Sequence, residues 1–214
     1  MAGRFIVLEG GEGVGKTTQA TLLSSWLAAR GIPHILTREP GGTAVGEVIR
    51  EVVLGRTDLE MPAESELLLI LAARAAFVRD VVRPALAEGK VVLADRFALS
   101  TLAYQGYARG IDLDDVRHGL RIAMGGLRPD LYLVLDLPAE EGTARQRREG
   151  MQPDRIEQEG DRFLQLVREG YLALAKTEPG VQVLSARGTP EDVHARIRGL
   201  LEACFPETFG ASVV

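Results

Sequence analysis

The octapeptide GGEGVGKT, from Gly10 to Thr17, constrains the fold of this chain more than any other segment. It matches the pattern G-x-x-x-x-G-K-[S/T] at every position and follows FIVLE, an apolar run with the length of a β-strand. In such a unit the glycines let backbone N–H groups point at phosphate oxygens, and the next helix adds the positive end of its dipole. The segment therefore predicts a nucleoside triphosphate site, with Lys16 at the β and γ phosphates and Thr17 at Mg²⁺; a glycine-rich turn without a ligand is the alternative.

Four further apolar runs alternate with helical patterns along the chain. The runs at 34–37, 90–94, 131–137 and 181–185 are typical of strands, and helical spacing fills 17–30, 44–54, 63–87 and 190 to about 205. Apolar strands that alternate with helices indicate a parallel sheet covered on both faces. We therefore expect a single α/β domain over residues 1–214.

Two segments depart from this alternation. Residues 145–162 are polar and rich in arginine, and they contain Gly150 and Pro153, so we expect a mobile flap there. Residues from about 206 to 214 show little pattern and are expected to fray.

Composition favours a small-molecule ligand over a nucleic acid or a membrane. The 214 residues carry a formal net charge of −5 without a dense basic block, which argues against general nucleic-acid binding. No run of about 18 apolar residues occurs, so we expect no membrane span. Cys204 is the one cysteine, which excludes an internal disulfide, and the N-terminal apolar run is too short for a signal peptide. We therefore expect a cytoplasmic protein.

Residues that directly follow the strands are candidates for ligand binding, because ligands of an open parallel sheet bind at the carboxyl ends of its strands. Asp95 ends an apolar strand, as expected of a carboxylate that holds Mg²⁺ or its water, and Arg96 beside it can bind a phosphate. Asp136 ends a strand of the same form, but it lacks an adjacent arginine. The turn at 38–43 after the second strand is either a surface loop or part of the site.

Arginines mark two further places whose role the residues alone leave open. Arg74 lies inside an apolar helical pattern, where a guanidinium is costly unless it is paired. A structural ion pair, a side chain that reaches solvent and a ligand contact are all compatible with this position. The flap contains five arginines, which either form a solvated helix with i,i+4 ion pairs or contact a ligand: Arg145, Arg147, Arg148, Arg155 and Arg162.

Five motifs occur in a specific order along the chain. They are the loop GGEGVGKTT, the turn TREPGGT, the strand end DRF, the following S-x-x-A-Y-Q-G at 100–106, and DRIE at 154–157. Together they resemble the motifs of the bacterial thymidylate kinases, from about Arg4 to about Phe205. The resemblance implies transfer of the γ-phosphoryl group of ATP to dTMP in a homodimer. It also implies a three-layer P-loop nucleoside monophosphate kinase fold, with a five-stranded parallel sheet and a short arginine-rich lid at about 145–162.

On the donor side, the resemblance implies a set of ATP-binding residues from the phosphate loop, the lid and the end of the last strand. These are Gly10, Gly11, Glu12, Gly13, Val14, Gly15, Lys16, Thr17, Thr18, Arg145, Arg187 and Gly188. Thr17 and Asp95 would hold Mg²⁺, and Lys16 and Arg96 would act on the transferred group.

A lid arginine is also expected to take part in catalysis. In the branch of the family whose phosphate loop lacks a basic residue, such an arginine supplies charge in the transition state. Positions 11–14 of this chain carry no basic side chain, so we expect Arg155 in this role, with Arg147 as the second choice.

On the acceptor side, the resemblance implies twelve dTMP-binding residues. These are Glu12, Arg38, Glu39, Pro40, Arg50, Ile70, Arg74, Arg96, Ser100, Thr101, Tyr104 and Gln105. The three arginines 38, 50 and 96 would surround the acceptor phosphate, and Glu12 would face the 3′-hydroxyl. Arg74 would hydrogen-bond a thymine carbonyl, and Tyr104 would pack against C2′ of the sugar and disfavour a ribose hydroxyl.

One position departs from the pattern of the family. Four residues before the base-reading arginine the family often has a phenylalanine that stacks on thymine, and this chain has Ile70 there. An aliphatic side chain covers the ring but loses a π contact worth about 1 kcal/mol. Either Phe77 or Phe97 compensates, or the base is held more loosely.

Two other functions remain as alternatives. One is a kinase of a different acceptor, such as a deoxynucleoside or another monophosphate. The other is a nucleotide-hydrolysing switch or motor without a small acceptor; a guanine-specific version is disfavoured because the chain contains no asparagine for an N-K-x-D loop.

Overall fold

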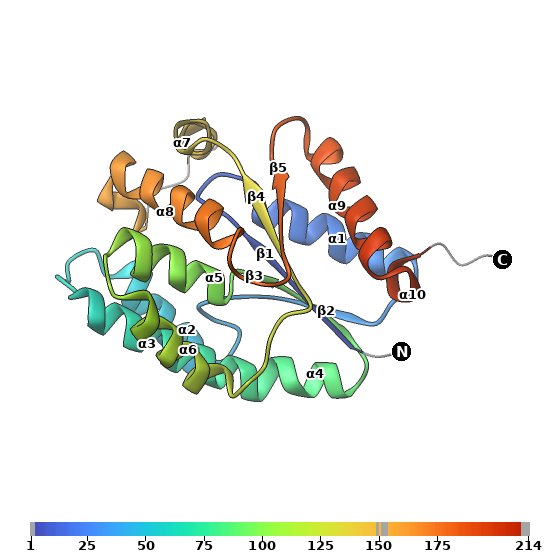
Figure 1. The fold of residues 1–214 in the computed structure, drawn as a ribbon, viewed down its shortest axis with the longest axis horizontal. Coiled ribbons are helices and arrows are strands. Elements are labelled where there is room, and N and C mark those ends of the chain that lie inside the picture. The colour runs from blue at the N-terminus through green and yellow to red at the C-terminus, as the bar shows by residue number, and fades with distance from the viewer. Residues whose placement is uncertain (1–2, 149, 151–153, 211–214) are drawn as a thin grey trace.

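Five parallel strands form a sheet at the centre of the structure (Figure 1). The computed structural model describes residues 3–148, 150 and 154–210. The strands are β1 (Arg4–Glu9), β2 (His34–Arg38), β3 (Val91–Asp95), β4 (Leu131–Asp136) and β5 (Val181–Ser185). They lie in the order β2-β3-β1-β4-β5. The predicted five-stranded parallel sheet is confirmed, and each strand begins and ends within one residue of its expected position.

Helices connect the strands and cover both faces of the sheet. They are α1 (Lys16–Ala29), α2 (Ala44–Arg50), α3 (Ala63–Phe77), α4 (Arg83–Ala87), α5 (Ala98–Thr101), α6 (Leu113–Met124), α7 (Ala139–Arg148), α8 (Asp161–Leu174), α9 (Pro190–Cys204) and α10 (Pro206–Phe209). Wider π-type turns, η1 (Glu51–Gly55) and η2 (Val78–Val82), continue α2 and α3, so the predicted helix at 63–87 runs through α3, η2 and α4. A third, η3 (Leu102–Ala108), follows α5, and a short 3₁₀ turn, η4 (Glu157–Glu159), precedes α8. Within residues 3–148, 150 and 154–210, none of these helices has the length and apolar character needed to cross a bilayer.

Alternate residues of β1 face opposite layers of helices. Phe5 and Val7 point into a core shared with α2, α3, α6 and α8, whereas Ile6 and Leu8 point into a core shared with α1 and α9. Figure 1 shows α1, α9 and α10 on one side of the sheet and the larger group of helices on the other. The edge strands β2 and β5 are less buried than the three inner strands, because each pairs on one side only.

The loops that follow β1, β2 and β3 leave the sheet at the same edge. The strand register pairs Arg38 with Asp95, and Asp95 with Leu8. After β1 the chain crosses through α1 to β2 on one side, whereas β4 and β5 lie on the other side of β1. Such a reversal of strand order leaves a crevice beyond the carboxyl ends of the strands, and ligands bind in it. The fold therefore brings the phosphate loop and the residues after β2 and β3 to one place.

Residues 206–210, where the sequence predicts fraying, include the helix α10 and pack against the core. The Phe209 ring is fully buried and stacks on Trp26 at a centroid distance of 6.0 Å. Arg30 donates to the Phe209 carbonyl at 2.8 Å and also to the Gly210 carbonyl. The four-residue helix α10 closes the core between α1 and α9. It is too short for a helical hydrophobic period to appear in the sequence. Residues 211–214 lie outside the described part of the chain.

We predict that α10 contributes strongly to stability. Phe209→Ala should lower the free energy of unfolding by about 3–5 kcal/mol, because the lost ring leaves a cavity in a packed core. Urea denaturation followed by circular dichroism measures this change. Leu59→Ala, at an exposed apolar position before α3, is the control and should unfold at nearly the same urea concentration as the wild type. A loss below about 1 kcal/mol for Phe209→Ala would show that the ring is not packed in solution.

Candidate active site

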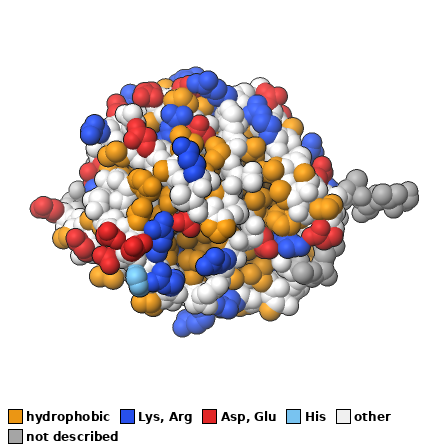
Figure 2. Space-filling view, viewed as in Figure 1, with side chains coloured by type: hydrophobic (Ala, Val, Ile, Leu, Met, Phe, Trp, Pro, Cys, Tyr) orange, Lys and Arg blue, Asp and Glu red, His pale blue; other side chains and the backbone are white. Residues whose placement is uncertain are grey.

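A cleft of about 1170 Å³ opens at the carboxyl end of the sheet. Its walls come from the phosphate loop and the start of α1, the ends of β2 and β3, α3, η3, and the segments 145–146 and 154–157. A pocket for one small molecule typically measures about 300–1000 Å³, so this cleft is large enough for two ligands side by side. On the face of the molecule shown in Figure 2, acidic and basic side chains are interspersed among apolar ones and do not form a broad basic surface.

The phosphate loop takes a backbone shape that requires its glycines. Gly13 and Gly15 have φ angles of 65° and 90°, in the left-handed region. Gly13 also lies so close to Gly142 of α7 that a Cβ on Gly13 would come within 2.0 Å of the Gly142 carbonyl oxygen. A Cβ on Gly142 would come within 2.2 Å of the Glu12 carbonyl oxygen. Helix α7 therefore packs directly on the phosphate loop, and no sequence motif marks Gly142 as part of this contact.

Lys16 closes the phosphate loop on itself. Its ammonium group donates to the carbonyl oxygens of Gly10 at 3.1 Å and Gly11 at 2.6 Å. Burial and the neighbouring Arg96 guanidinium lower the pKa of Lys16, and the Glu12 carboxylate opposes this shift. A buried ammonium at the positive end of α1 is suited to bind phosphate oxygens.

Thr17 and Asp95 meet beside the loop. The Thr17 hydroxyl donates to Oδ2 of Asp95 at 2.8 Å. A hydroxyl and a carboxylate are hard oxygen ligands, and protein-bound Mg²⁺ takes one or two such groups together with phosphate oxygens and water. The two side chains therefore fit the predicted Mg²⁺ site.

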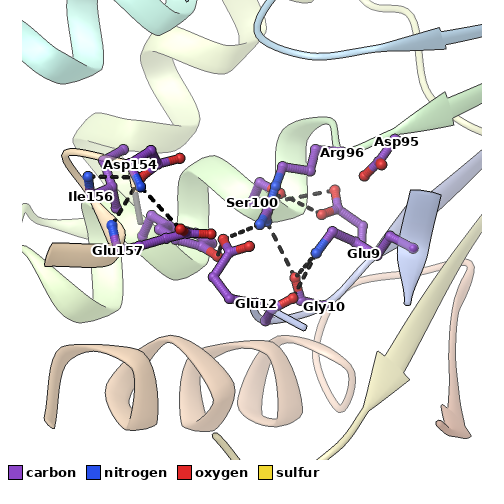
Figure 3. Close-up of polar contacts among 12 residues, drawn as sticks. Glu9, Gly10, Glu12, Asp95, Arg96, Ser100, Asp154, Ile156 and Glu157 are labelled. Atoms are coloured by element: carbon purple, nitrogen blue, oxygen red, sulfur yellow. Dashed lines mark hydrogen bonds and ion pairs between the residues drawn. The ribbon is translucent and has the colours of Figure 1, made fainter. Parts of the chain in front are cut away.

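Arg96 is the central cation of the cleft (Figure 3). Its Nη2 forms an ion pair with Oε1 of Glu12, and the Tyr104 hydroxyl donates to the same oxygen at 2.7 Å. Burial alone would raise the pKa of Glu12, but Arg96 and Lys16 lower it to about 2, so Glu12 is a carboxylate. Arg96 has a φ of 73°, which a non-glycine residue rarely adopts. The turn from β3 into α5 thereby directs the guanidinium toward the phosphate loop.

Glu9 at the end of β1 lies buried behind Arg96. It accepts from the hydroxyl of Ser100 at 2.5 Å and from the hydroxyl of Tyr171 at 2.9 Å. Nη1 of Arg96 donates to the Tyr171 hydroxyl at 3.3 Å. Burial raises the pKa of Glu9, and the hydrogen bond from Ser100 opposes this shift.

Neither Glu9 nor Tyr171 was expected from the sequence. An acid at the end of an apolar strand is the signal that identified Asp95, and Glu9 has the same form. Tyr171 lies on α8, far along the chain, and its neighbours in the sequence carry no corresponding signal. The structure thus adds two residues to the site: Glu9, which its position at a strand end could have identified, and Tyr171, which no sequence signal marks.

Arg74 proves to be both an ion-pair partner and a cleft residue. Its guanidinium is 2% exposed, pairs with Glu39 at 2.7 Å, and donates to the Thr101 hydroxyl at 2.6 Å. Glu39 follows β2 in the turn whose role the residues left open. Burial raises the pKa of Glu39 to about 7, although Arg74 opposes this shift, and the carboxyl oxygen Oε1 has no hydrogen-bond partner. Both side chains line the cleft, where this oxygen and the remaining guanidinium N–H groups can meet a ligand.

Three arginines form a basic part of the cleft wall. Arg38, Arg50 and Arg96 all line it, and the charges of Arg38 and Arg96, together with burial, lower the pKa of Arg50. Arg50 donates to the Pro40 carbonyl at 2.9 Å, which fixes it against the turn after β2. This concentration of positive charge is suited to a phosphate dianion.

Neither of the two phenylalanines considered as a replacement for a stacking ring at Ile70 lines the cleft. Phe77 and Phe97 are fully buried in the core, with ring centroids 6.3 Å apart. Phe97 lies under Arg74, whose Cζ is 5.0 Å from the ring centroid. Ile70 lines the cleft, so an aliphatic side chain occupies the position of the family's phenylalanine.

The lid segment divides its charged side chains between the cleft and the protein interior. Arg145, Asp154 and Glu157 line the cleft, and Arg147 is exposed. Arg155 is 9% exposed and pairs with Glu66 of α3 instead of lining the cleft. The expected catalytic arginine is therefore held away from the phosphate loop in this conformation. Residues 149 and 151–153 of the lid lie outside the described residues.

The far end of the cleft lies between α7 and the loop after β5. Arg145 donates to the Ala186 carbonyl at 3.2 Å, and Gly188 lines the cleft together with Val193. Arg187 is exposed, pairs with Glu141 of α7 at 2.5 Å and does not line the cleft.

The structure brings most of the expected site residues together. All twelve expected acceptor residues line the cleft, as do Thr17 and Asp95. Nine of the twelve expected ATP residues line it as well; the others are Gly10 and Gly11, whose carbonyls hold Lys16, and Arg187. Of the four expected catalytic residues, Lys16 and Arg96 are in the cleft, whereas Arg147 and Arg155 are not.

Comparison with known proteins agrees with this geometry. The family model described as "Thymidylate kinase" matches residues 8–197. The chain belongs to the thymidylate kinase family. It is 46% identical over 209 residues to a thymidylate kinase of Pseudomonas putida, covering 95% of this chain and 99% of the relative, and 50% identical over 195 residues to that of Pelotomaculum thermopropionicum, covering 91% and 90%. The crystal structure of thymidylate kinase from Ehrlichia chaffeensis superposes with a TM-score of 0.74 at 29% identity, covering 94% of this chain and all of that one.

Glu157 in the lid should make stability depend on pH. Burial, with the charges of Glu12 and Asp154, raises its pKa to about 7. Because this pKa lies above the ordinary value of 4.5, the stabilisation from the protonated carboxyl is complete below pH 4.5 and is lost as the pH rises through about 7. The Glu157→Gln variant cannot ionise at this position. Its free energy of unfolding should therefore rise relative to that of the wild type between about pH 5 and about pH 8. The exposed Glu169→Gln on α8 is the control, and equal pH profiles for Glu157→Gln and the wild type would contradict the assignment.

Proposed function

We propose that the chain transfers the γ-phosphoryl group of ATP to dTMP and yields ADP and dTDP. The observation that carries the proposal is the cleft itself, which is lined by Lys16 of the phosphate loop, by Arg96 and by the buried Arg74–Glu39 pair. ATP binds the loop at one end, and the base of dTMP meets Arg74 and Ile70 at the other. The family membership of the chain agrees with these two substrates.

The acceptor phosphate needs no general base. Its second pKa is about 6, so it is largely a dianion at neutral pH. Alignment of the two phosphates and neutralisation of charge are then the whole task of the site. Arg38 and Arg50 hold the acceptor phosphate, and Arg96 and Lys16 neutralise charge on the transferred group.

Thr17 and Asp95 are the residues that would hold Mg²⁺, by their oxygen ligands. A bound Mg²⁺ would supply charge neutralisation at the transferred phosphate. We expect Glu12 and Tyr104 to face the sugar. Their hydrogen bond holds the tyrosine ring in the cleft, where it would exclude a 2′-hydroxyl and favour a deoxyribose.

The lid closes over the phosphates to exclude water, because water in the site would lead to hydrolysis of ATP. Arg145 already lines the cleft. The Arg147 side chain is exposed, and no hydrogen bond or ion pair joins its guanidinium to the part of the chain that the structure describes. We therefore favour Arg147 over Arg155 as the lid arginine of the transition state.

The acceptor is tested by steady-state kinetics with ATP, Mg²⁺ and five acceptors. We expect kcat/KM to rank dTMP first, above dUMP, dCMP, AMP and thymidine, because Arg74 and the three arginines recognise a base and a phosphate together. Lys16→Met is the control for phosphate-loop chemistry and should lose activity by about 10²-fold or more. A preference for thymidine over dTMP would contradict the proposal, and ATP hydrolysis that dTMP does not stimulate would favour a switch.

We also propose a homodimer, formed through the outer faces of α2, α3 and α6. These adjacent helices expose large apolar side chains, with Val48 63%, Leu68 66% and Ile122 84% accessible. Such a patch on one face is typical of an interaction surface. In a two-fold symmetric dimer, the same apolar patch of a second copy of the chain would cover it. A cytoplasmic location stays a prediction from the sequence.

The dimer is tested by placing a charge in this patch. Leu68→Glu should convert the dimer to a monomer in analytical ultracentrifugation, because a buried unpaired carboxylate is unfavourable in an interface. Val183→Glu, at an exposed apolar position on β5, is the matched control and should leave the mass unchanged. A wild type that sediments as a monomer at micromolar concentration would rule out this surface.

A further inference from the structure

A buried carboxylate outside the cleft receives three donors from different parts of the chain. Glu66 of α3 has no exposed surface and does not line the cleft. Gln105 donates to it at 2.8 Å, Arg109 donates at 3.1 and 3.2 Å, and Nη2 of Arg155 completes the set. Burial alone would raise the pKa of Glu66, but the hydrogen bonds from Arg109 and Arg155 outweigh it and lower the pKa. Glu66 is therefore an ionised group that holds two arginines.

These contacts attach the C-terminal end of the lid, residues 154–159, to the body of the protein. Nε of Arg155 donates to the Val53 carbonyl at 2.6 Å, and the Arg155 backbone N–H donates to Leu54 at 3.0 Å. Arg109 adds a second link, because it also pairs with Glu159 at 2.6 Å. The lid end thus rests on η1, α3 and the end of η3.

The same elements carry the acceptor half of the cleft. Ile70 and Arg74 lie one and two turns beyond Glu66 on α3. Gln105 follows Tyr104 on η3, and both line the cleft. Through Glu66, the position of the lid end is set relative to the residues that meet the acceptor.

The Arg155–Glu66 pair is not suited to separate during each turnover. Both groups are at least nine-tenths buried, and separation would leave a buried charge without its partner. Arg155 also donates two hydrogen bonds to backbone carbonyls of η1. The Arg155 guanidinium is therefore suited to fix the position of the lid end and not to move to a phosphate.

We infer that Glu66 is a positioning residue for phosphoryl transfer, and that it acts by holding the lid end through Arg155. The inference rests on the proposed transfer to dTMP, and it gives Arg155 a role different from the transition-state contact expected from the motif. Neither residue touches a substrate. Their effect on the reaction passes through the position of the lid.

Three variants separate this role from a catalytic one: Glu66→Gln, Arg155→Gln and the double variant. If Glu66 positions the lid, each single variant lowers kcat about 10-fold, and the double variant is no slower than the worse single one, since both act through one contact. If Arg155 instead leaves Glu66 to meet the phosphate, Arg155→Gln lowers kcat while Glu66→Gln leaves it unchanged or raises it, and the inference fails. If both variants lower Tm but keep the wild-type kcat, the pair is merely structural and the inference also fails.

A second readout does not depend on which acceptor the enzyme uses. Arg147 and Arg148 are exposed in the lid, so trypsin cleavage after them reports lid position when a non-hydrolysable ATP analogue is bound. We expect the analogue to protect the wild type, and Glu66→Gln to be cleaved several-fold faster. Equal cleavage of the two would overturn the inference. A wild type that is protected but does not phosphorylate dTMP would overturn the proposed function alone.

The control and a reserve variant complete the experiment. Glu169→Gln, at an exposed position on α8 outside the Glu66 cluster, keeps every contact of Glu66 and Arg155, and it should match the wild type in kcat and cleavage. If Glu66→Gln does not fold, Arg155→Lys takes its place, because lysine keeps the charge but cannot bond Glu66 and Val53 together. A fall in kcat with faster lid cleavage supports the inference, and no change in either overturns it.

Discussion

The guanidinium of Arg96 is the charge on which the rest of the site depends. It lies between Glu12 on one side and the hydroxyls of Ser100 and Tyr171 on the other, and these hydroxyls contact the buried Glu9. Because an unpaired buried charge is costly, this arginine and its acids can only be buried together. An acceptor phosphate at Arg96 would replace Glu12 as the anion facing Nη2, while Nη1 stays anchored from behind. Glu12 then keeps the hydrogen bond from the Tyr104 hydroxyl and the nearby charge of Lys16, which also lowers its pKa.

Two further buried ion pairs join distant parts of the chain, one in the cleft wall and one outside it. Glu39 pairs with Arg74 across 35 residues of chain, and Glu66 pairs with Arg155 across 89. Each pair joins elements that the sheet alone does not hold together: the turn after β2 to α3, and α3 to the lid. Removing one partner of such a pair lowers stability much more than replacing both partners with apolar side chains, because a single removal leaves one charge buried and unpaired. Buried arginines in this chain therefore shape the cleft as well as bind within it.

Much of the fold follows from local sequence, whereas the expected acceptor residues come from the resemblance to a family. The strands are continuous apolar runs, and the carboxyl ends of parallel strands meet by geometry, so Asp95 and Arg96 could be assigned beside the phosphate loop. What could not be predicted depends on packing between distant segments. Gly142 matters only because α7 crosses the loop there, and α10 is too short to have a period. Phe77 and Phe97 are aromatic and close in sequence to the site, yet the core holds both rings.

The lid shows where a motif stops being informative. In DRIE, the Asp154 carboxylate accepts from the backbone N–H groups of Ile156 and Glu157, both at 2.9 Å, and this turn decides which way each side chain faces (Figure 3). Asp154 and Glu157 face the cleft, and Arg155 faces the interior. An irregular turn has no period from which such directions could be derived, and the flap arginines share the same charge. A motif therefore predicts which segment lies near a site, but it does not predict which of its side chains contacts the substrate. That depends on the side chains packed around the segment. For Arg155 the neighbouring group is the carboxylate of Glu66 on α3.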